Sequence, residues 1–385
     1  MSKVFLFAVI ILLSIGCSKN DENEPLTDYP QMSDPDDVCS AMDDIEFMRY
    51  CYENFDVNKD GKVSPIEAQA VTTISFGNSI TASNSTDGIV AKVKSLKGIQ
   101  YFTNLTTLEC NRCILKSLDT SKNTKLTSLK CMNCALTELD LSQNKALVHL
   151  ECGNMPLLID MENLNAIQEL NLSNNSNLQQ LNCECLIYLT NLNISNNKDL
   201  KILNCENTIS LSALDISNNK ALKLLSCSST ALSALDISNN SRLEELDCSS
   251  SKIRLLEIVN NIELKRIACQ DSELTQLSIS NAPKLEELDC YNTKLTQLGI
   301  SNAPKLEELD CSNTKLTQLS ISNAPKLENL NCSNTKLTSL DISKCTNLRS
   351  VYWYSCPLSS ITVRIGQNPY AIFGNIQGVS IQYVE

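Results

Sequence analysis

Apolar positions recur along most of this chain with a period of about 21 residues. The stretch Leu285–Lys305 is one unit of the pattern, and near copies of it begin again at Leu306 and Leu327. Within the unit, Leu288–Cys290 alternates apolar, polar, apolar, which is the period of a strand that turns its Leu and Cys inward. A fixed repeat of this length indicates a solenoid, because a single coil cannot bury its own apolar face. The pattern therefore predicts one stacked array in place of several globular domains.

A cysteine marks the same inward position in successive units. The period predicts about twelve coils within residues 105–358, with ten extra residues inserted around Leu158–Ile167. A coil of 21 residues has no room for a full helix opposite its strand. We therefore expect a curved parallel β-sheet with little convex helix, and short 3₁₀ or extended segments on the far side. The ladder cysteines are Cys110, Cys131, Cys152, Cys183, Cys205, Cys227, Cys248, Cys269, Cys290, Cys311 and Cys332.

A second column of the repeat is polar. An inward amide at this position is expected to bond the backbone of the neighbouring turn. From Ala282 onward, alanine replaces asparagine, and the following proline limits the turn. The amide column consists of Asn123, Asn144, Asn175, Asn197, Asn219, Asn240 and Asn261.

Both ends of a solenoid need a cover, because an open terminal coil exposes its core. At the N-terminal end, Val71–Phe76 alternates like a strand, and residues 77–104 are expected to complete an N-terminal cap that leads into the first coil. At the other end, residues 359–385 are expected to form a short β cap. Its predicted strands are Ile361–Val363, Ala371–Phe373 and Val379–Tyr383.

Residues 38–76 contain a calcium-binding motif. Apolar residues within Asp43–Phe55 have helical spacing, and the following loop matches the EF-hand pattern at its diagnostic positions. Carboxylate, amide and hydroxyl oxygens, one backbone carbonyl and a closing glutamate are the ligands that calcium takes in this loop. We predict one calcium ion here; the alternative is a loop that keeps the shape without the ion. The predicted ligands are Asp56, Asn58, Asp60, Lys62, Ser64 and Glu67.

Residues 1–17 have the pattern of an export signal. Lys3 supplies the positive start, and Val4–Ile15 is an apolar run of twelve residues, shorter than the roughly 20 that a spanning helix needs. Gly16 before Cys17 resembles the cleavage box of bacterial lipoproteins, which implies a lipidated Cys17 and a location at the bacterial outer membrane or cell surface, with the membrane contacted only through the lipid. Residues 18–37 are acidic and contain three prolines, and we expect a disordered linker there. An ordinary export signal cut nearby is the alternative.

Composition excludes several classes of function. The net charge of −12 argues against nucleic acid as a partner, since phosphate binding needs a basic patch. His149 is the only histidine and occupies an outward position, where a solvated surface residue is the ordinary interpretation. Catalysis by a Ser/His/Asp or Cys/His set therefore lacks support, and no glycine-rich phosphate loop is present. We do not expect an enzyme.

The 19 cysteines allow three interpretations. Ladder cysteines occupy positions that suit small buried apolar side chains, which favours structural thiols. Disulfides are the second interpretation, although side chains that point in parallel from neighbouring coils make the required dihedral hard to reach. Zinc is the third, because the spacing Cys110–Cys113 with Cys131–Cys134 matches a four-cysteine site.

Carboxylates recur at two outward positions of the strand segment, and in-register stacking would place like charges close together. Such a stripe is either a solvated face or an acidic docking surface. Aromatic residues at the C-terminal end favour docking, and we predict a protein ligand with a cationic surface on the concave face. The predicted contact residues are Glu245, Asp247, Glu287, Asp289, Tyr291, Glu308, Asp310, Tyr352 and Tyr354.

The unit L-x-x-L-x-C-x-x-T-x-L resembles the leucine-rich repeat, and Leu136–Asn144 adds the far-side pattern L-x-x-L-x-L-S-x-N. Together they resemble the internalins, above all the internalin J-like cysteine-ladder family, over about two thirds of the chain. The resemblance implies a cell-surface protein that mediates protein recognition or adhesion. A glycan-binding surface lipoprotein of a carbohydrate-uptake system is the alternative.

Overall fold

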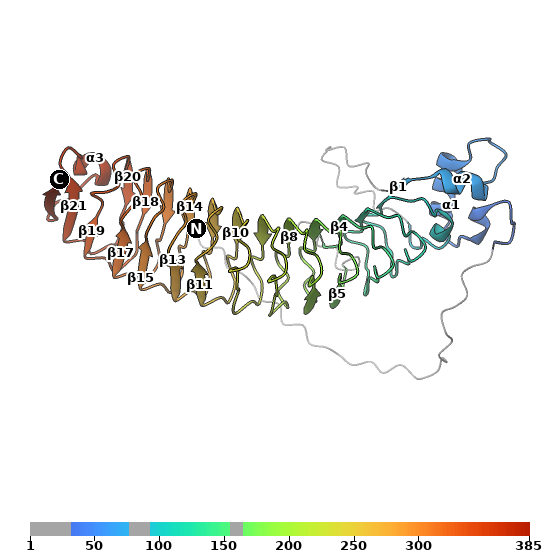
Figure 1. The fold of residues 1–385 in the computed structure, drawn as a ribbon, viewed down its shortest axis with the longest axis horizontal. Coiled ribbons are helices and arrows are strands. Elements are labelled where there is room, and N and C mark those ends of the chain that lie inside the picture. Colours follow the sequence, from blue (N-terminus) through green and yellow to red (C-terminus); the bar gives the residue numbers. More distant parts are fainter. Residues whose placement is uncertain (1–31, 77–92, 155–164) are drawn as a thin grey trace, which may run out of the picture.

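The structure is a computed structural model that describes residues 32–76, 93–154 and 165–385. In the described residues the coils stack into one elongated, gently curved solenoid whose N-terminal and C-terminal segments lie at opposite ends (Figure 1). A parallel sheet of 13 strands runs along the concave side, with one strand from each coil. This confirms the predicted solenoid, because strand β1 of the N-terminal cap is followed by one strand for each of the twelve coils.

The concave sheet keeps the register of the repeat, and each Leu–x–Cys segment adds a strand of three residues. Its strands are β1 (Thr73–Ser75), β2 (Thr107–Glu109), β3 (Ser128–Lys130), β4 (His149–Glu151), β6 (Gln180–Asn182), β8 (Ile202–Asn204), β9 (Leu224–Ser226), β10 (Glu245–Asp247), β12 (Arg266–Ala268), β14 (Glu287–Asp289), β16 (Glu308–Asp310), β18 (Asn329–Asn331) and β20 (Ser350–Tyr352).

The far side of the coils is extended, as predicted, and no helix lies there in the described part of the array. Short strands form three smaller sheets along it. The first pairs β5 (Glu169–Asn171) with β7 (Asn191–Asn193). The second contains β11 (Leu255–Ile258), β13 (Gln276–Ile279), β15 (Gln297–Ile300) and β17 (Gln318–Ile321), and the third contains β19 (Ser339–Asp341), β21 (Ser360–Arg364) and β22 (Ser380–Val384).

The amide column bonds neighbouring coils together, as the sequence predicts. In Asn240, Nδ2 donates to the carbonyl oxygens of Ile216 and Asn219 in the preceding coil, at 3.1 and 3.0 Å. All seven asparagines of the column are fully buried and repeat this pair of bonds. Where Ala282 and its successors replace asparagine, the far side forms the four-stranded sheet, whose ladder supplies bonds between coils instead.

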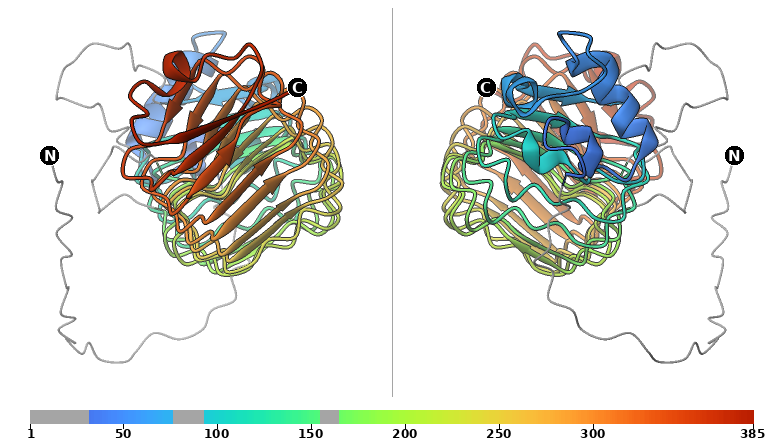
Figure 2. Two further views of the ribbon diagram at one scale, coloured as in Figure 1. Left: turned by 90° about the vertical axis from the view of Figure 1, so that its left-hand side faces the viewer. Right: turned by 90° about the vertical axis from the view of Figure 1, so that its right-hand side faces the viewer.

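The N-terminal cap covers the first coil with two short 3₁₀ turns, two helices and one strand (Figure 2). These are η1 (Val38–Ala41), α1 (Ile45–Phe55), α2 (Pro65–Ala70), β1 and η2 (Ile99–Tyr101). Asp44 links the cap to the lead-in of the array. Its Oδ1 accepts from the backbone N–H groups of Glu46 and Phe47 at the start of α1, and its Oδ2 accepts from that of Lys94 at 2.6 Å.

The packed part of the cap begins before residue 38, so that it includes the last residues of the predicted linker, 18–37. Asp34 pairs with Lys62 at 2.8 Å. Asp37 is buried and caps η1, and its second oxygen accepts from the Tyr52 hydroxyl at 2.7 Å. The residues just before η1 therefore belong to the cap.

The C-terminal cap differs from the prediction at one segment. Ala371–Phe373, expected as a strand, is the end of helix α3 (Pro369–Phe373). Asn368 caps this helix, accepting from the backbone N–H groups of Tyr370 and Ala371, and Pro369 at its first position removes an N–H that would lack a partner. Helix α3 covers Trp353, whose Nε1 donates to the carbonyl of Phe373 at 3.1 Å. Trp353 takes the ladder position of cysteine in the last coil.

The ladder cysteines are fully buried, in positions that suit small apolar side chains. Burial raises the pKa of each ladder thiol, as it does for Cys152 and Cys248, to about 12 in both cases. Among the described residues, no group of three or more His, Cys, Asp or Glu side chains is placed to hold a metal ion. The zinc interpretation of the four N-terminal cysteines therefore gains no support from their arrangement.

Candidate functional site

Two columns of outward side chains cover the concave sheet, one from the first and one from the third residue of each strand. Register is strict, so that each side chain lies beside its counterpart in the next coil. The chemistry of the columns changes along the array from mixed charges through an apolar centre to an acidic region and then to Asn and Tyr. The first column reads Thr107, Ser128, His149, Gln180, Ile202, Leu224, Glu245, Arg266, Glu287, Glu308, Asn329, Ser350, and the third-residue column reads Glu109, Lys130, Glu151, Asn182, Asn204, Ser226, Asp247, Ala268, Asp289, Asp310, Asn331, Tyr352.

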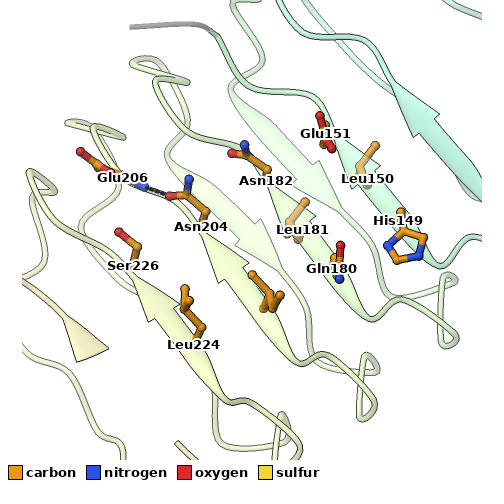
Figure 3. A pocket seen from close by; sticks show the side chains of 11 residues that line it. His149, Leu150, Glu151, Gln180, Leu181, Asn182, Asn204, Glu206, Leu224 and Ser226 are labelled. Carbon is orange, nitrogen blue, oxygen red and sulfur yellow. Dashed lines mark hydrogen bonds between the residues drawn. The ribbon is translucent and has the colours of Figure 1, made fainter. Parts of the chain in front are cut away.

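The centre of the face is a shallow apolar depression of about 300 Å³ (Figure 3). Ile202 and Leu224 face each other in register and are only half-buried. His149 lies at one margin and Glu206 at the other. The sequence analysis did not select Ile202 and Leu224, although an apolar residue at an outward strand position could have revealed them. An apolar pair on the surface of an otherwise polar sheet suits contact with a partner.

Beyond this centre, four carboxylates gather in two adjacent coils. Glu287 lies beside Glu308, and Asp289 beside Asp310. Asp310 has partners of its own, because its oxygens accept from the Asn331 side-chain amide and the Ser312 backbone N–H, both at 2.9 Å. We call Glu287, Asp289, Glu308 and Asp310 the acidic quartet.

The acidic stripe is interrupted in one coil. Arg266 separates Glu245 from Glu287, and Ala268 separates Asp247 from Asp289. Arg266 forms its ion pair with Glu245, while its register neighbour on the other side is Glu287 of the quartet. The coil that contains Arg266 differs from its neighbours at these two positions. An alignment of the repeats with one another would have revealed this difference.

A third row of acids lies just before the strands, and Glu244 in this row is paired with lysine. Glu244 lies between Lys223 and Lys265, at 2.8 and 2.7 Å. Hydrogen bonds from these two lysines lower the pKa of Glu244 to about 2. Among the described residues the quartet forms no ion pair with lysine, whereas Glu244 forms two.

Burial raises the pKa of Asp289 to about 6, with the nearby carboxylates of Glu287, Asp310 and Glu308 adding to the effect. The pKa in the folded state therefore lies above the ordinary value of 3.8, so that the folded chain holds the proton more tightly than the unfolded chain. Stability from this group is greatest when the carboxyl is protonated, and it falls as the pH rises from about 4 to about 6.

We expect Asp289→Asn to raise the midpoint of thermal unfolding at pH 7.5 and to leave it unchanged near pH 4. The reason is that the amide removes the like-charge repulsion, and Asn331 shows that the same column accepts an amide. Thermal unfolding from pH 4 to 7.5 tests this, with Asp247→Asn as the control, because Asp247 has the uncharged neighbours Ser226 and Ala268. Parallel pH profiles for wild type and Asp289→Asn would contradict it.

The three predicted tyrosines lie toward the C-terminal part of the array. Tyr352 follows Asn331 in the third-residue column and is 59% exposed, and Tyr354 is 83% exposed. Tyr291 is half-buried at the end of its strand; burial and the carboxylates of Asp271, Asp289 and Asp310 raise its pKa. Aromatic surface therefore flanks the quartet on the side away from Arg266.

The predicted calcium loop joins α1 to α2 and has a helix–loop–helix shape, at the end of the array away from the quartet (Figure 1). Both oxygens of Asp56 accept from the loop backbone, from Asp60 N–H at 3.2 Å and from Gly61 N–H at 3.0 Å. One oxygen of Asp60 accepts from Lys62 N–H at 2.9 Å, and the other from the Asn58 side-chain amide at 2.9 Å. These hydrogen bonds hold the loop backbone around the side chains of Asp56, Asn58 and Asp60.

Glu67 closes the loop. Its Oε1 accepts from Val57 N–H at 2.9 Å, and its Oε2 accepts from the N–H and hydroxyl of Ser64 at 2.9 and 2.8 Å. These bonds, the one from Ser64 N–H first, lower the pKa of Glu67, and they form the capping box of α2. The types of oxygen donor and the sharp turn at Gly61, whose φ is 84°, are those of a calcium loop, although the side chains of Asp56, Asp60 and Glu67 do not gather into a metal-holding cluster in the described structure. Such an ion would compete with these backbone donors for the oxygens of Glu67.

Cys17 and the rest of the predicted export signal lie outside the described residues. Within the described residues, no helix is both long and apolar enough to cross a membrane.

Comparison with known proteins identifies the repeats. Residues 283–323 match the family model of leucine-rich repeats (2 copies). The fold is similar to the functional domain of InlJ from Listeria monocytogenes, which includes a cysteine ladder, with 24% identity over 83% of this chain and 73% of that one and a TM-score of 0.62. It is also similar to the internalin InlF from Listeria monocytogenes, with 18% identity over 91% and 98% of the two chains and a TM-score of 0.53.

A third similar structure is a leucine-rich repeat protein of Leptospira interrogans, with 23% identity over 68% of this chain and 69% of that one and a TM-score of 0.53. No curated protein matches the sequence. These likenesses and the matched repeats give the chain an internalin-like leucine-rich repeat fold, as the sequence predicts.

Proposed function

We propose that this leucine-rich repeat protein is a recognition protein whose concave sheet binds a protein partner. The observation that carries the proposal is the ordered change along one face, from half-exposed Ile202 and Leu224 to the acidic quartet and then to Tyr352. A partner that fits this order has an apolar patch beside a cluster of lysine or arginine. Apolar contact would supply affinity, and the charges would mainly speed association.

A screen of the purified chain against host and bacterial surface proteins, with a glycan array in parallel, tests the proposal. The matched variant is Ile202→Glu with Leu224→Glu, which removes the apolar centre and leaves the core unchanged, because both residues stand at the outward first position of their strands. We expect a retained protein ligand that the double variant no longer retains. Retention of glycans alone, or equal retention by both chains, would contradict the proposal.

We also propose that Cys17 is lipidated and that the protein is anchored at the bacterial outer membrane or cell surface. The support is the short apolar run that ends at Gly16 and Cys17, with a polar segment after it. Cys17→Ala should move the protein from the membrane fraction to the soluble fraction of expressing cells, while Cys290→Ala should not. Membrane association that survives Cys17→Ala would rule out the lipid anchor.

We propose that calcium occupies the loop of the N-terminal cap, where Asp56, Asn58, Asp60, Ser64 and Glu67 would hold it with the carbonyl of Lys62. The ion would neutralise the loop carboxylates and stiffen the cap; it would take no part in the recognition face. A dissociation constant of about 10⁻⁴ to 10⁻³ M is expected for an extracellular module of this kind.

Calorimetric titration of wild type, Glu67→Gln and Glu53→Gln tests the calcium site. Glutamine at residue 67 keeps the capping box but loses the charge, so that affinity should fall at least tenfold. Glu53 is an exposed acid on α1, and Glu53→Gln makes the same change in charge outside the loop. Absence of binding by wild type, or equal affinity in all three chains, would remove the site.

A further inference from the structure

Among the cysteines outside the ladder, two lie close to a ladder cysteine of the preceding coil, one near each end of the array. Three residues after the ladder cysteine, most coils place a Thr or Ser whose hydroxyl donates to the carbonyl of that cysteine, as Thr293 does to Cys290 at 2.8 Å. Cys134 and Cys356 occupy this position in their coils. Both are buried, with 0% and 7% of their surfaces exposed.

Each of these thiols reaches diagonally to the ladder cysteine of the preceding coil. Sγ of Cys134 lies 2.9 Å from the carbonyl oxygen of Cys110, and the two thiols are in hydrogen-bonding contact. Sγ of Cys356 lies 3.2 Å from Oγ1 of Thr335, which itself lies 2.8 Å from the carbonyl oxygen of Cys332. The thiols of Cys332 and Cys356 are also in hydrogen-bonding contact.

The diagonal arrangement removes the obstacle that in-register ladder cysteines face. Side chains at equivalent positions of neighbouring coils point in parallel, which disfavours the disulfide dihedral. Cys134 and Cys356 project from a different part of the coil, so that their thiols meet the ladder thiol from a different direction. In the folded, reduced chain the hydrogen bond with Cys332 lowers the pKa of the Cys356 thiol to about 6.

We propose that Cys110 with Cys134, and Cys332 with Cys356, form two disulfides that staple the first two and the last two coils of the array. The proposal rests on the proposed export, because disulfides form and persist in oxidising compartments. The two pairs lie at the ends of the array, where they would have a structural role. A terminal coil has a repeat neighbour on one side only, and a covalent bond to that neighbour opposes its fraying.

Formation of these disulfides needs an electron acceptor, and an oxidised thiol–disulfide oxidoreductase serves as that acceptor. One cysteine thiolate attacks the disulfide of the oxidoreductase and forms a mixed disulfide, and the second thiolate then displaces the reduced oxidoreductase. Two protein S–H bonds are lost and one S–S bond forms, while two electrons and two protons reduce the disulfide of the acceptor to a dithiol. Because the thiols are buried in the folded coils, the exchange takes place during folding.

Peptide mapping of the full chain tests the pairing. Free thiols are blocked with N-ethylmaleimide in denaturant, either as the protein is harvested from cells or after the reduced chain is refolded in a glutathione redox buffer. We expect the two linked peptide pairs in both samples, and blocked Cys290. Links in the refolded sample alone would support the pairing and contradict export. Blocked thiols at all four positions in both samples, or links between other cysteines, would overturn the proposal.

A matched set of variants separates the disulfides from ordinary packing. Cys134→Thr with Cys356→Thr restores the common residue of this position. Cys113→Thr is the control, because the residue in the ladder position of the preceding strand is Phe76, which has no thiol. Dithiothreitol should lower the unfolding midpoint of wild type and Cys113→Thr by about 5 °C and leave the double variant unchanged. Equal sensitivity of the double variant and wild type would overturn the proposal.

Discussion

Asn240→Ala should lower the free energy of unfolding by about 3 kcal/mol, one of the largest effects expected for a single side chain in this protein. The substitution deletes two hydrogen bonds and leaves the carbonyl oxygens of Ile216 and Asn219 buried between coils. Each carbonyl keeps one backbone donor, the N–H of Asn219 for Ile216 and that of Leu222 for Asn219. The loss is therefore that of two hydrogen bonds, about 0.5–1.5 kcal/mol each, together with the space left by the amide. Within the described residues, Oδ1 of Asn240 has no donor, and its removal offsets part of that loss.

Asn239→Ala is the matched control, since this neighbouring asparagine is exposed and should change stability by no more than about 0.5 kcal/mol. Asn240→Asp should be worse than Asn240→Ala, because it turns an acceptor toward the two carbonyl oxygens in place of a donor. Urea unfolding followed by circular dichroism measures all three chains. A loss for Asn240→Ala no larger than that for Asn239→Ala would show that the column is dispensable.

The repeat made most of the fold predictable, because each coil repeats one set of constraints. The ladder cysteines, the amide column and β1 lie where periodicity and burial place them. The cap at the C-terminal end was harder to predict, since its segments occur once. Ala371–Phe373 has the apolar content of a strand, but Asn368, Pro369 and Gly374 supply the start and end of a short helix. The capping residues therefore explain why this segment is a helix and not a strand.

The recognition face was predictable only in part, because its character depends on neighbours across coils. Column positions follow from the repeat, and the sequence thus placed Glu287 beside Glu308. The interruption by Arg266 and the half-exposed pair of Ile202 and Leu224 belong to single coils that differ from the consensus. The same holds for the diagonal approach of Cys134 to Cys110, since linear spacing gives no direction to a side chain.

Reversal of the quartet's charge should slow association with a basic partner at least tenfold at low salt. In Glu287→Lys with Glu308→Lys, two of four carboxylates become ammonium groups, so that the local field changes from attractive to nearly neutral for a cation. Electrostatic steering acts mainly on the association rate and weakens as salt screens it. The salt dependence of association should therefore disappear in the variant while it persists in wild type.

The control is Glu169→Lys with Glu257→Lys, which changes the net charge equally but lies on the far-side strands β5 and β11. Folding should survive both changes, since the two quartet positions are outward positions of their strands and the substitutions enter no core. Surface plasmon resonance with the partner found in the binding screen measures the rates across salt concentrations. Equal slowing in the two double variants would mean that only net charge matters, and an unchanged rate in the quartet variant would mean that the acidic quartet is a solvated face.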